Sequence, residues 1–296
     1  MYTVVEQLNE DIIALKDLLN DFLLNHAKIK YSPITTDSSI VIIGSDYRWE
    51  TLNTEGKQLQ SRIYKKYNNF YELTTVLITD LPNNSMRDFK ENAKSILNII
   101  AQKDIWDSSI QKVLSKALNC LDNQLKILNT IYDPKSGTYF FVPDTNALLT
   151  NPEIEKWEFP EIQTFEIILV PVVLSELDKL KVFHNNQVVR EKAQSLIRRI
   201  QEFRRRGRIT EGVTLVKGKS SLRAIAIEPN FNKSLPWLQQ DNNDDKFIAS
   251  FIEVMKMHPN STVTLITSDI NLQNKAEFAR LPFIEPPRPR VDNTQT

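Results

Sequence analysis

The chain has 296 residues, with 37 Lys and Arg balanced by 37 Asp and Glu, so net charge gives no sign of a polyanionic partner. Its single cysteine, Cys120, excludes an intrachain disulfide and a cysteine-based zinc site, and favours a reducing, cytoplasmic compartment. The acids of the first residues and the lack of a long apolar run argue against a signal peptide and a membrane anchor, and no glycine loop has the spacing that cradles a nucleotide.

Residues 1–132 are predicted to form a mainly α-helical domain. Apolar residues recur at alternating steps of three and four along 5–22, and a similar stripe runs along 106–131. Shorter helices are expected over 47–72 and 86–103. The apolar run "SIVIIG" at 39–44 is ambiguous, and a short strand is one interpretation.

Two features of this half have alternative interpretations. The stripe along 5–22 fits a helix packed inside its own domain, which we favour, or a coiled-coil dimer. The stretch "RIYKKYNNFY" interleaves Lys with Tyr64, Tyr67 and Tyr71, which suits a helical core face better than a nucleic-acid contact. A homo-oligomer or a regulatory protein bound through these helices stays open.

The pattern changes at the turn-rich stretch "DPKSGTY", residues 133–139. Short apolar runs then alternate with helical stretches over 137–286, which predicts an α/β domain with a parallel sheet flanked by helices. Residues 287–296 are predicted to be a disordered tail. The expected strands are "TYFFVPD", "FEIILVP" and "VTLITSD", and the expected helices cover 145–151, 172–183, 187–206, 244–257 and 271–279.

Carboxylates follow the ends of these predicted strands. Asp144 comes directly after the first strand and Asp269 after the last, while Glu176 lies about one turn into the helix after the second. Asp244 and Asp245 open a later helix, where the simpler interpretation is a helix cap. In an open parallel sheet, ligands bind beyond the carboxyl ends of the strands, so these acids are expected at one edge.

Several carboxylates in one cleft repel one another and raise each other's pKa unless a cation is present. Mg²⁺ or Mn²⁺ prefers oxygen ligands and commonly bridges carboxylates to a substrate phosphate. The pattern therefore indicates metal-assisted chemistry on phosphate esters. The scattered histidines and the serines without nucleophile-elbow glycines offer no competing mechanism; they are His26, His184, His258, Ser175 and Ser195.

Four stretches resemble, in order, the acidic motifs of PIN-domain nucleases. They are "FFVPDTNALL", "ILVPVVLSELDKLK", "NDDKFIAS" and "VTLITSDINLQNKA". The segment "VVREKAQSLIRRIQEF" is also similar to a helix of the PINc-like branch. The resemblance covers about residues 138–286; the long stretch from Asn186 to Asn243 and the N-terminal half have no counterpart in it.

The resemblance implies a metal-dependent nuclease with a quartet of acids. By position, the quartet is Asp144, Glu176, Asp244 and Asp269. Asp245 is a further candidate ligand, because which of the adjacent pair binds metal is open. The resemblance also implies polar residues near the cleft that hold metal-bound water or phosphate, with helix cap and turn as alternative roles; these are Asn146, Thr267 and Ser268.

The densest basic run of this domain is "RRIQEFRRRGR". Its arginines cannot all lie on one helical stripe, so part of the run faces solvent. It is either a solvated helix end or a ridge that tracks nucleic-acid phosphates, and we favour the ridge. The candidate residues are Arg198, Arg199, Arg204, Arg205, Arg206 and Arg208.

The sequence thus predicts a PIN-like α/β domain after a helical domain, with endonucleolytic hydrolysis of RNA as the implied activity. Spacing alone does not separate RNA from DNA. The alternatives are a catalytically silent PIN-like module that binds RNA or protein, and a metal-dependent DNA nuclease. No membrane partner is expected.

Overall fold

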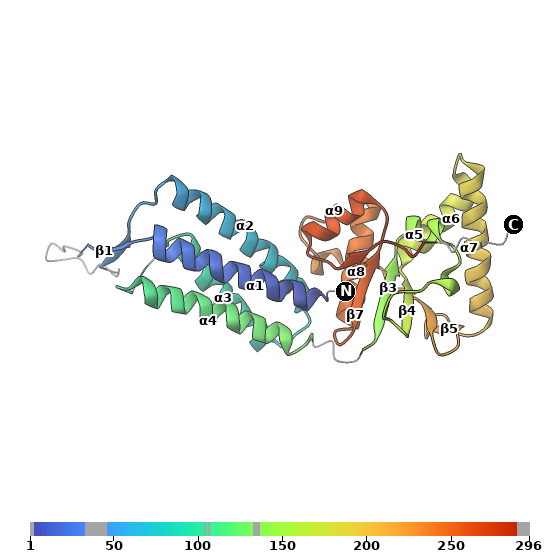
Figure 1. The fold of residues 1–296 in the computed structure, drawn as a ribbon, viewed down its shortest axis with the longest axis horizontal. Helices are drawn as coiled ribbons and strands as arrows, with labels where there is room; N and C mark the ends of the chain where they lie inside the picture. Colours follow the sequence, from blue (N-terminus) through green and yellow to red (C-terminus); the bar gives the residue numbers. More distant parts are fainter. Residues whose placement is uncertain (1–2, 33–45, 104, 106, 133–136, 289–296) are drawn as a thin grey trace. The chain divides into compact units, whose positions relative to one another are not determined.

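The computed structural model describes residues 3–32, 46–103, 105, 107–132 and 137–288, so the run at 39–44 and most of the predicted tail lie outside the described residues. The chain divides into two compact units (Figure 1). One unit holds residues 5–131, and the other holds residues 1–4 and 132–296. The α/β class and the helical N-terminal region that the sequence predicts are confirmed.

The first unit is built from long helices whose apolar stripes face inward. The stripe of α1 is buried within the chain itself, with Leu8, Leu15 and Leu19 inaccessible to solvent. This arrangement agrees with a helix packed inside its own domain. The helices are α1 (Val4–Asp21), continued by a π-helical turn (Phe22–His26), α2 (Thr54–Leu77), α3 (Asn83–Ile100) and α4 (Ile110–Asn129).

Two expectations for this unit are corrected. The predicted helix at 47–72 begins late, because Tyr47–Trp49 is a strand, β2, paired antiparallel with β1 (Ile29–Tyr31). The helix starts after Asn53, whose side chain accepts a hydrogen bond from the Gly56 amide. The predicted tyrosine core face also fails in part: Tyr67 is fully buried, but Tyr64 is 48% exposed.

The second unit contains a six-stranded sheet in the order β5-β6-β4-β3-β7-β8, parallel except for β5. The central strands β3 and β4 are almost wholly buried, which explains their near-continuous apolar sequences. The strands are β3 (Tyr139–Pro143), β4 (Phe165–Leu169), β5 (Val213–Val216), β6 (Ser220–Ala224), β7 (Thr262–Ile266) and β8 (Phe283–Ile284).

Helices pack around this sheet at or within one residue of their predicted bounds. They are α5 (Thr145–Thr150), α6 (Pro171–Phe183), α7 (Gln187–Arg205), α8 (Asn243–Met257) and α9 (Ile270–Phe278). The long stretch from Asn186 to Asn243 contains two apolar runs, "GVTLVKG" and "SLRAIAIEPNF", and these contribute the β5–β6 hairpin at one side of the sheet. None of the described helices is long and apolar enough to cross a membrane.

The topology brings distant segments to the carboxyl edge of the sheet. Strand β3 leads through α5 to β4 on one side, while β7 pairs with β3 on the other. The chain therefore changes direction between β3 and β7, and such switch points form crevices beyond the strand ends.

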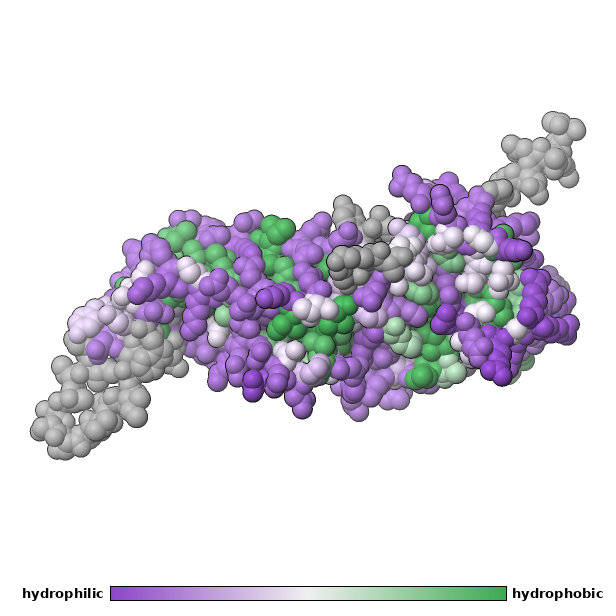
Figure 2. All heavy atoms as spheres, turned by 90° about the horizontal axis from the view of Figure 1, so that it is seen from below, coloured by the Kyte–Doolittle hydropathy of each residue, from purple (hydrophilic) through white to green (hydrophobic). Residues whose placement is uncertain are grey.

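Most of the face in Figure 2 is hydrophilic, with smaller apolar areas over each unit.

Candidate active site

Asp144 lies directly after β3 and is 94% buried by its surroundings, with 6% of its surface exposed. Its amide continues the ladder with β7 by donating to the Ile266 carbonyl, at 2.9 Å. One carboxylate oxygen caps α5 by accepting from the Ala147 amide at 2.6 Å, and the other accepts from the Thr267 hydroxyl. The side chain is thus fixed by two neighbouring elements.

Asp269 follows β7 and plays the same structural part at the next helix. Its Oδ1 accepts from the amides of Asn271 and Leu272 at the start of α9, at 2.8 and 3.2 Å. Its Oδ2 accepts from the side-chain amide of Asn146 at 3.2 Å, which links the end of β7 to α5. Both strand-end acids are therefore helix caps as well as candidate ligands.

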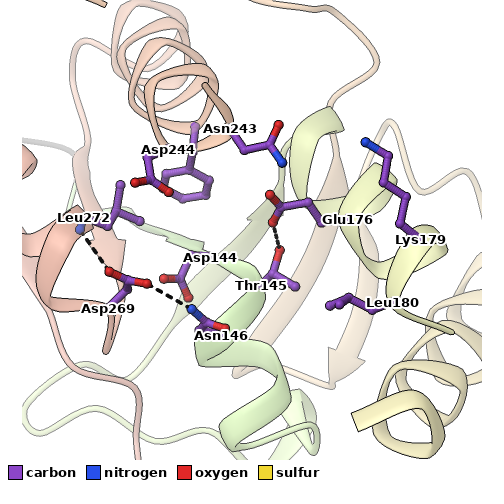
Figure 3. Close-up of a pocket in the computed structure, with 11 residues that line it drawn as sticks. Asp144, Thr145, Asn146, Glu176, Lys179, Leu180, Asn243, Asp244, Asp269 and Leu272 are labelled. Atoms are coloured by element: carbon purple, nitrogen blue, oxygen red, sulfur yellow. Dashed lines mark hydrogen bonds between the residues drawn. The ribbon is translucent and has the colours of Figure 1, made fainter. Parts of the chain in front are cut away.

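Glu176 reaches the same place from α6. Because it lies about one turn into this helix, its carboxylate meets the start of α5, where the Thr145 hydroxyl donates to its Oε2 at 2.6 Å. Figure 3 shows Asp144 in the middle of the group, with Asp269 on one side and Glu176 on the other.

The adjacent pair at the start of α8 divides its roles. Asp244 lines the pocket with the other three acids, whereas Asp245 is 5% exposed and does not line it. Asp245 accepts from the Gln239 amide at 3.0 Å and from the Lys275 ammonium at 2.8 Å. Asp245 as a metal ligand stays a prediction, and of the adjacent pair only Asp244 lines the pocket.

Neither member of the pair caps α8, which corrects the simpler interpretation of this stretch. The cap is Asn242, whose side-chain oxygen accepts from the Asp245 amide at 3.2 Å. Lys275 of α9 contacts both carboxylates, with Asp244 Oδ2 at 3.2 Å. Burial lowers the pKa of Lys275, but its hydrogen bonds to Asp245 and Asp244 outweigh this effect and leave the pKa raised. The ammonium of Lys275 thus bridges the buried carboxylate of Asp245 and the carboxylate of Asp244.

The four acids of the predicted quartet line one cavity of about 350 Å³. Its lining includes the almost fully buried Phe247 and Leu272, and its polar groups come from four helices of the unit, α5, α6, α8 and α9, or their capping residues. The acids are Asp144, Glu176, Asp244 and Asp269.

The surroundings of Asp144 in this cavity change its pKa. Burial raises the pKa of Asp144 to about 6, against the lowering effect of the bonds from Thr267 and Ala147. The negative charges of Asp269 and Glu176 raise it further. Carboxylates close enough to raise a neighbour's pKa form the kind of site that a divalent cation stabilises.

In the described part of the chain, no group of three or more His, Cys, Asp or Glu side chains is arranged to hold a metal ion. The reason lies in the hydrogen bonds given above. Each acid of the quartet is turned toward a donor, such as Thr145 for Glu176 and Lys275 for Asp244. The oxygen donors suit Mg²⁺ or Mn²⁺ in kind, but ligation requires Glu176 and Asp244 to turn from these partners.

Residues 141–285 match the family model described as a PIN domain, and this range contains all four acids. The C-terminal half of the chain is a PIN domain. PIN domains are generally nucleases and typically use divalent metals. No curated protein gave a match to the chain.

The polar residues that the sequence singled out take different places in the PIN domain. Asn146 lines the pocket and bonds Asp269. Thr267 is inaccessible to solvent and lies behind Asp144, so it orients that carboxylate and does not face the cavity. Ser268 is exposed and is not among the residues lining the cavity.

None of the six predicted arginines lines the acidic pocket of the PIN domain. Arg199 is paired with Glu155, and Arg208 with Glu211 at 2.9 Å, so both have structural partners. Arg206 lies over the ring of Phe203. The remaining three, Arg198, Arg204 and Arg205, are exposed and have no ion pair with any residue that the structure describes.

The histidines take structural positions. His258 ends α8 and stacks on Phe140, with ring centroids 4.1 Å apart. Burial and the charge of Arg223 lower the pKa of His258, against the raising effect of Glu166. His184 accepts from the Asn186 amide in the turn between α6 and α7. Neither ring lines the pocket.

Sequence reasoning missed three residues of the site. Thr145 directly follows Asp144 and Lys179 lies three residues after Glu176, so adjacency and helical spacing gave a signal for both. Lys275 lies inside the stretch "VTLITSDINLQNKA", but its spacing does not link it to Asp244, 31 residues earlier; only the packing of α9 against α8 joins them.

Proposed function

We propose that this PIN domain is a divalent-metal-dependent endoribonuclease. The observation that carries the proposal is the shared pocket: four carboxylates from four segments face one cavity at the carboxyl edge of the sheet. Such a site suits metal-assisted hydrolysis of a phosphodiester better than acid–base work by a carboxylate pair, because four carboxylates share one cavity and their oxygens are the ligands that a divalent cation prefers.

The chain's own residues have distinct parts in this proposal. Asp144 and Asp269 are held by helix amides and neighbouring side chains, so they offer fixed ligands for Mg²⁺ or Mn²⁺, with Asp244 as the third. Glu176 would ligate a second ion or orient the attacking water. The chemistry that such ions supply is polarisation of the phosphate and a lower pKa for bound water.

Thr267 and Asn146 support the ligands. Thr267 donates to the Asp144 carboxylate and accepts from the Asp269 amide at 3.0 Å. One hydroxyl thus orients the side chain of Asp144 and fixes the backbone at Asp269. Asn146 fixes the outer oxygen of Asp269. Preorganised ligands of this kind reduce the reorganisation that a site needs when it binds metal and substrate.

RNA as substrate and the cytoplasm as compartment belong to the proposal, as does a homo-oligomer or regulatory protein bound through the N-terminal helices. Retention of the full quartet disfavours the alternative of a silent binding module. The alternative of a metal-dependent DNA nuclease shares the same chemistry and needs a direct comparison of substrates.

The test is cleavage of a labelled circular single-stranded RNA with Mn²⁺, Mg²⁺ or EDTA, beside single-stranded DNA of the same sequence. A circle has no ends, so any cut is endonucleolytic. The proposal predicts cutting of RNA with either metal and none with EDTA. Cutting of DNA alone would support the DNA nuclease, and binding without cutting in either metal would support the silent module.

A further inference from the structure

One face of α6 continues the pocket outward. Glu176, Lys179 and Leu180 all line the cavity, and they lie at positions i, i+3 and i+4 of the helix. Phe183 is the next residue of this face, at i+7, and it ends the helix. Seven residues at about 1.5 Å each place it about 10 Å along the helix from Glu176.

Phe183 is 79% exposed, the most exposed large apolar side chain of the described residues. Val182, next to it in α6, and Val188, in the first turn of α7, are 55% and 58% exposed, so the ends of these two helices carry exposed apolar side chains. No aromatic partner covers the Phe183 ring within the described chain. A large aromatic ring left in water next to a polar cleft indicates a contact surface.

The tip is held in place by its backbone contacts. Arg190 of α7 donates to the carbonyls of His184 and Asn185. Asn186 caps α7 by accepting from the Val188 amide at 2.9 Å, and Gln194 donates to the Lys181 carbonyl at 3.2 Å. Phe183 therefore lies at the end of a helical hairpin whose turn is fixed by these hydrogen bonds.

Lys179 supplies a positive charge between the acids and this tip. Figure 3 shows it on the opposite side of the pocket from Asp269. Among the described residues it has no ion pair, whereas the nearby Lys181 is paired with Asp178. An unpaired ammonium at the mouth of an acidic pocket suits a phosphate that must approach carboxylates.

We propose that the face of α6 from Lys179 to Phe183 is a track for single-stranded RNA leaving the pocket. Lys179 binds a backbone phosphate next to the acids, and Phe183 stacks on a base farther along the strand. Lys179 and Phe183 are four residues apart, about 6 Å along the helix, so one strand can meet both side chains. The inference rests on the proposed nuclease function, and stacking makes the contact tolerant of base identity.

A nucleic acid is favoured over a protein as the occupant because Phe183 lies on the same face of α6 as the pocket-lining residues Glu176 and Lys179. The two valines add apolar surface at the tip, while the cation stands between tip and acids. Along α6, Lys179 can therefore contact a phosphate of the RNA backbone and Phe183 can stack on a base of the same RNA strand.

The test measures binding of a short fluorescent single-stranded RNA to the full chain carrying Asp144→Asn, with Ca²⁺, so that no RNA is cut. Phe183→Ala should weaken binding about 5- to 150-fold, the range for loss of one stacked base. Phe183→Leu should weaken it similarly, whereas Phe183→Trp should retain affinity and lose indole fluorescence on binding. Met257→Ala, also an exposed apolar residue, is the matched control and should change nothing.

Lys179→Gln should flatten the slope of log K against log salt by about 0.7, and Lys181→Gln should leave it unchanged. RNA affinity that is equal in wild type, Phe183→Ala and Phe183→Leu would overturn the track. A Phe183→Ala protein that changes only its self-association in sedimentation would overturn it in favour of a protein contact.

Failure of the track and failure of the proposed function give different results. If the protein with an intact Asp144 cuts RNA in Mn²⁺ but the Phe183 variants bind RNA as tightly as their parent, the nuclease function is supported and the track is overturned. If it cuts no RNA but binding depends on Phe183 and Lys179, the track is supported and the proposed catalysis fails.

Discussion

Asp144 uses one carboxylate both to cap a helix and to face an acidic pocket, so its ionisation carries a cost in the metal-free protein. Its folded-state pKa of about 6 lies above the ordinary value of 3.8. Between these values the folded protein binds more protons than the unfolded chain, so stability falls as pH rises through this window. Without metal, ionised Asp144 therefore lowers the unfolding free energy most at pH values above about 6, where its carboxylate would bind metal.

Asp144→Asn should remove this dependence. In EDTA, the unfolding free energy of the variant minus that of wild type should grow by about 3 kcal/mol as the pH rises from 4 to 7. The size follows from the shift of about two units in the pKa of Asp144. Urea unfolding at a series of pH values measures the difference. A difference that does not change with pH would show that Asp144 has an ordinary pKa in the folded protein.

The pair of Lys275 and Asp245 forms the second coupled site. Lys275→Met leaves the buried carboxylate of Asp245 without its cation, so unfolding free energy should fall by about 3 kcal/mol. Asp245→Asn in the same chain should recover much of this loss. Strictly additive effects in the double-mutant cycle would contradict the coupling.

Lys275 also sets the direction of Asp244, so the variant has a second, independent readout. The midpoint of Mn²⁺ activation should move to lower concentration in Lys275→Met, because Asp244 no longer has to leave the ammonium to bind metal, and Lys275→Arg should restore it in part. An unchanged midpoint with lowered stability would mean that the lysine only supports the fold.

At the scale of elements, the strands and helices of the PIN domain could be predicted because their signals are local. Buried parallel strands are continuous apolar runs, and the rule that ligands collect at strand carboxyl ends brought Asp144 and Asp269 together. The roles within the Asp244–Asp245 pair could not be predicted. They depend on Gln239 and Lys275, which reach the pair only in the folded chain.

Weaker elements escaped prediction for the same reason. The strand Tyr47–Trp49 has three residues and gains its form by pairing with Ile29–Tyr31, so its sequence resembled the start of a helix. The two strands of the β5–β6 hairpin were visible only as apolar runs, because the place of a hairpin in a sheet depends on its partner strand β4.

The end of α7 gives a prediction at the same scale. Replacing Arg204, Arg205 and Arg206 together by Gln should flatten the salt slope of RNA binding by about two units if each contacts a phosphate. The turnover rate at saturating RNA should stay unchanged, since none lines the pocket. Arg208→Gln, which removes a charge paired with Glu211, is the matched control. An unaltered slope in the triple variant would confine the RNA path to other faces, such as that of α6.

At the scale of the whole molecule, the chain has two compact units with separate cores. A fragment that starts at Gly137 should therefore be soluble, unfold cooperatively and keep basal nuclease activity. Circular dichroism and RNA cleavage by the fragment measure both. An insoluble or unfolded fragment would mean that the N-terminal helices are needed to complete the PIN domain.

The central claim is that the quartet forms a divalent-metal nuclease site. Its most direct measurement is the Mn²⁺-dependent rate of single-stranded RNA cleavage by wild type, Asp144→Asn, Asp269→Asn and Asp178→Asn. Asp178 pairs with Lys181 outside the pocket and serves as the matched acid control. We expect activity in wild type and Asp178→Asn, a loss of at least about a hundredfold in the other two variants, and folded protein in every case. Equal rates in wild type, Asp144→Asn and Asp269→Asn would contradict it.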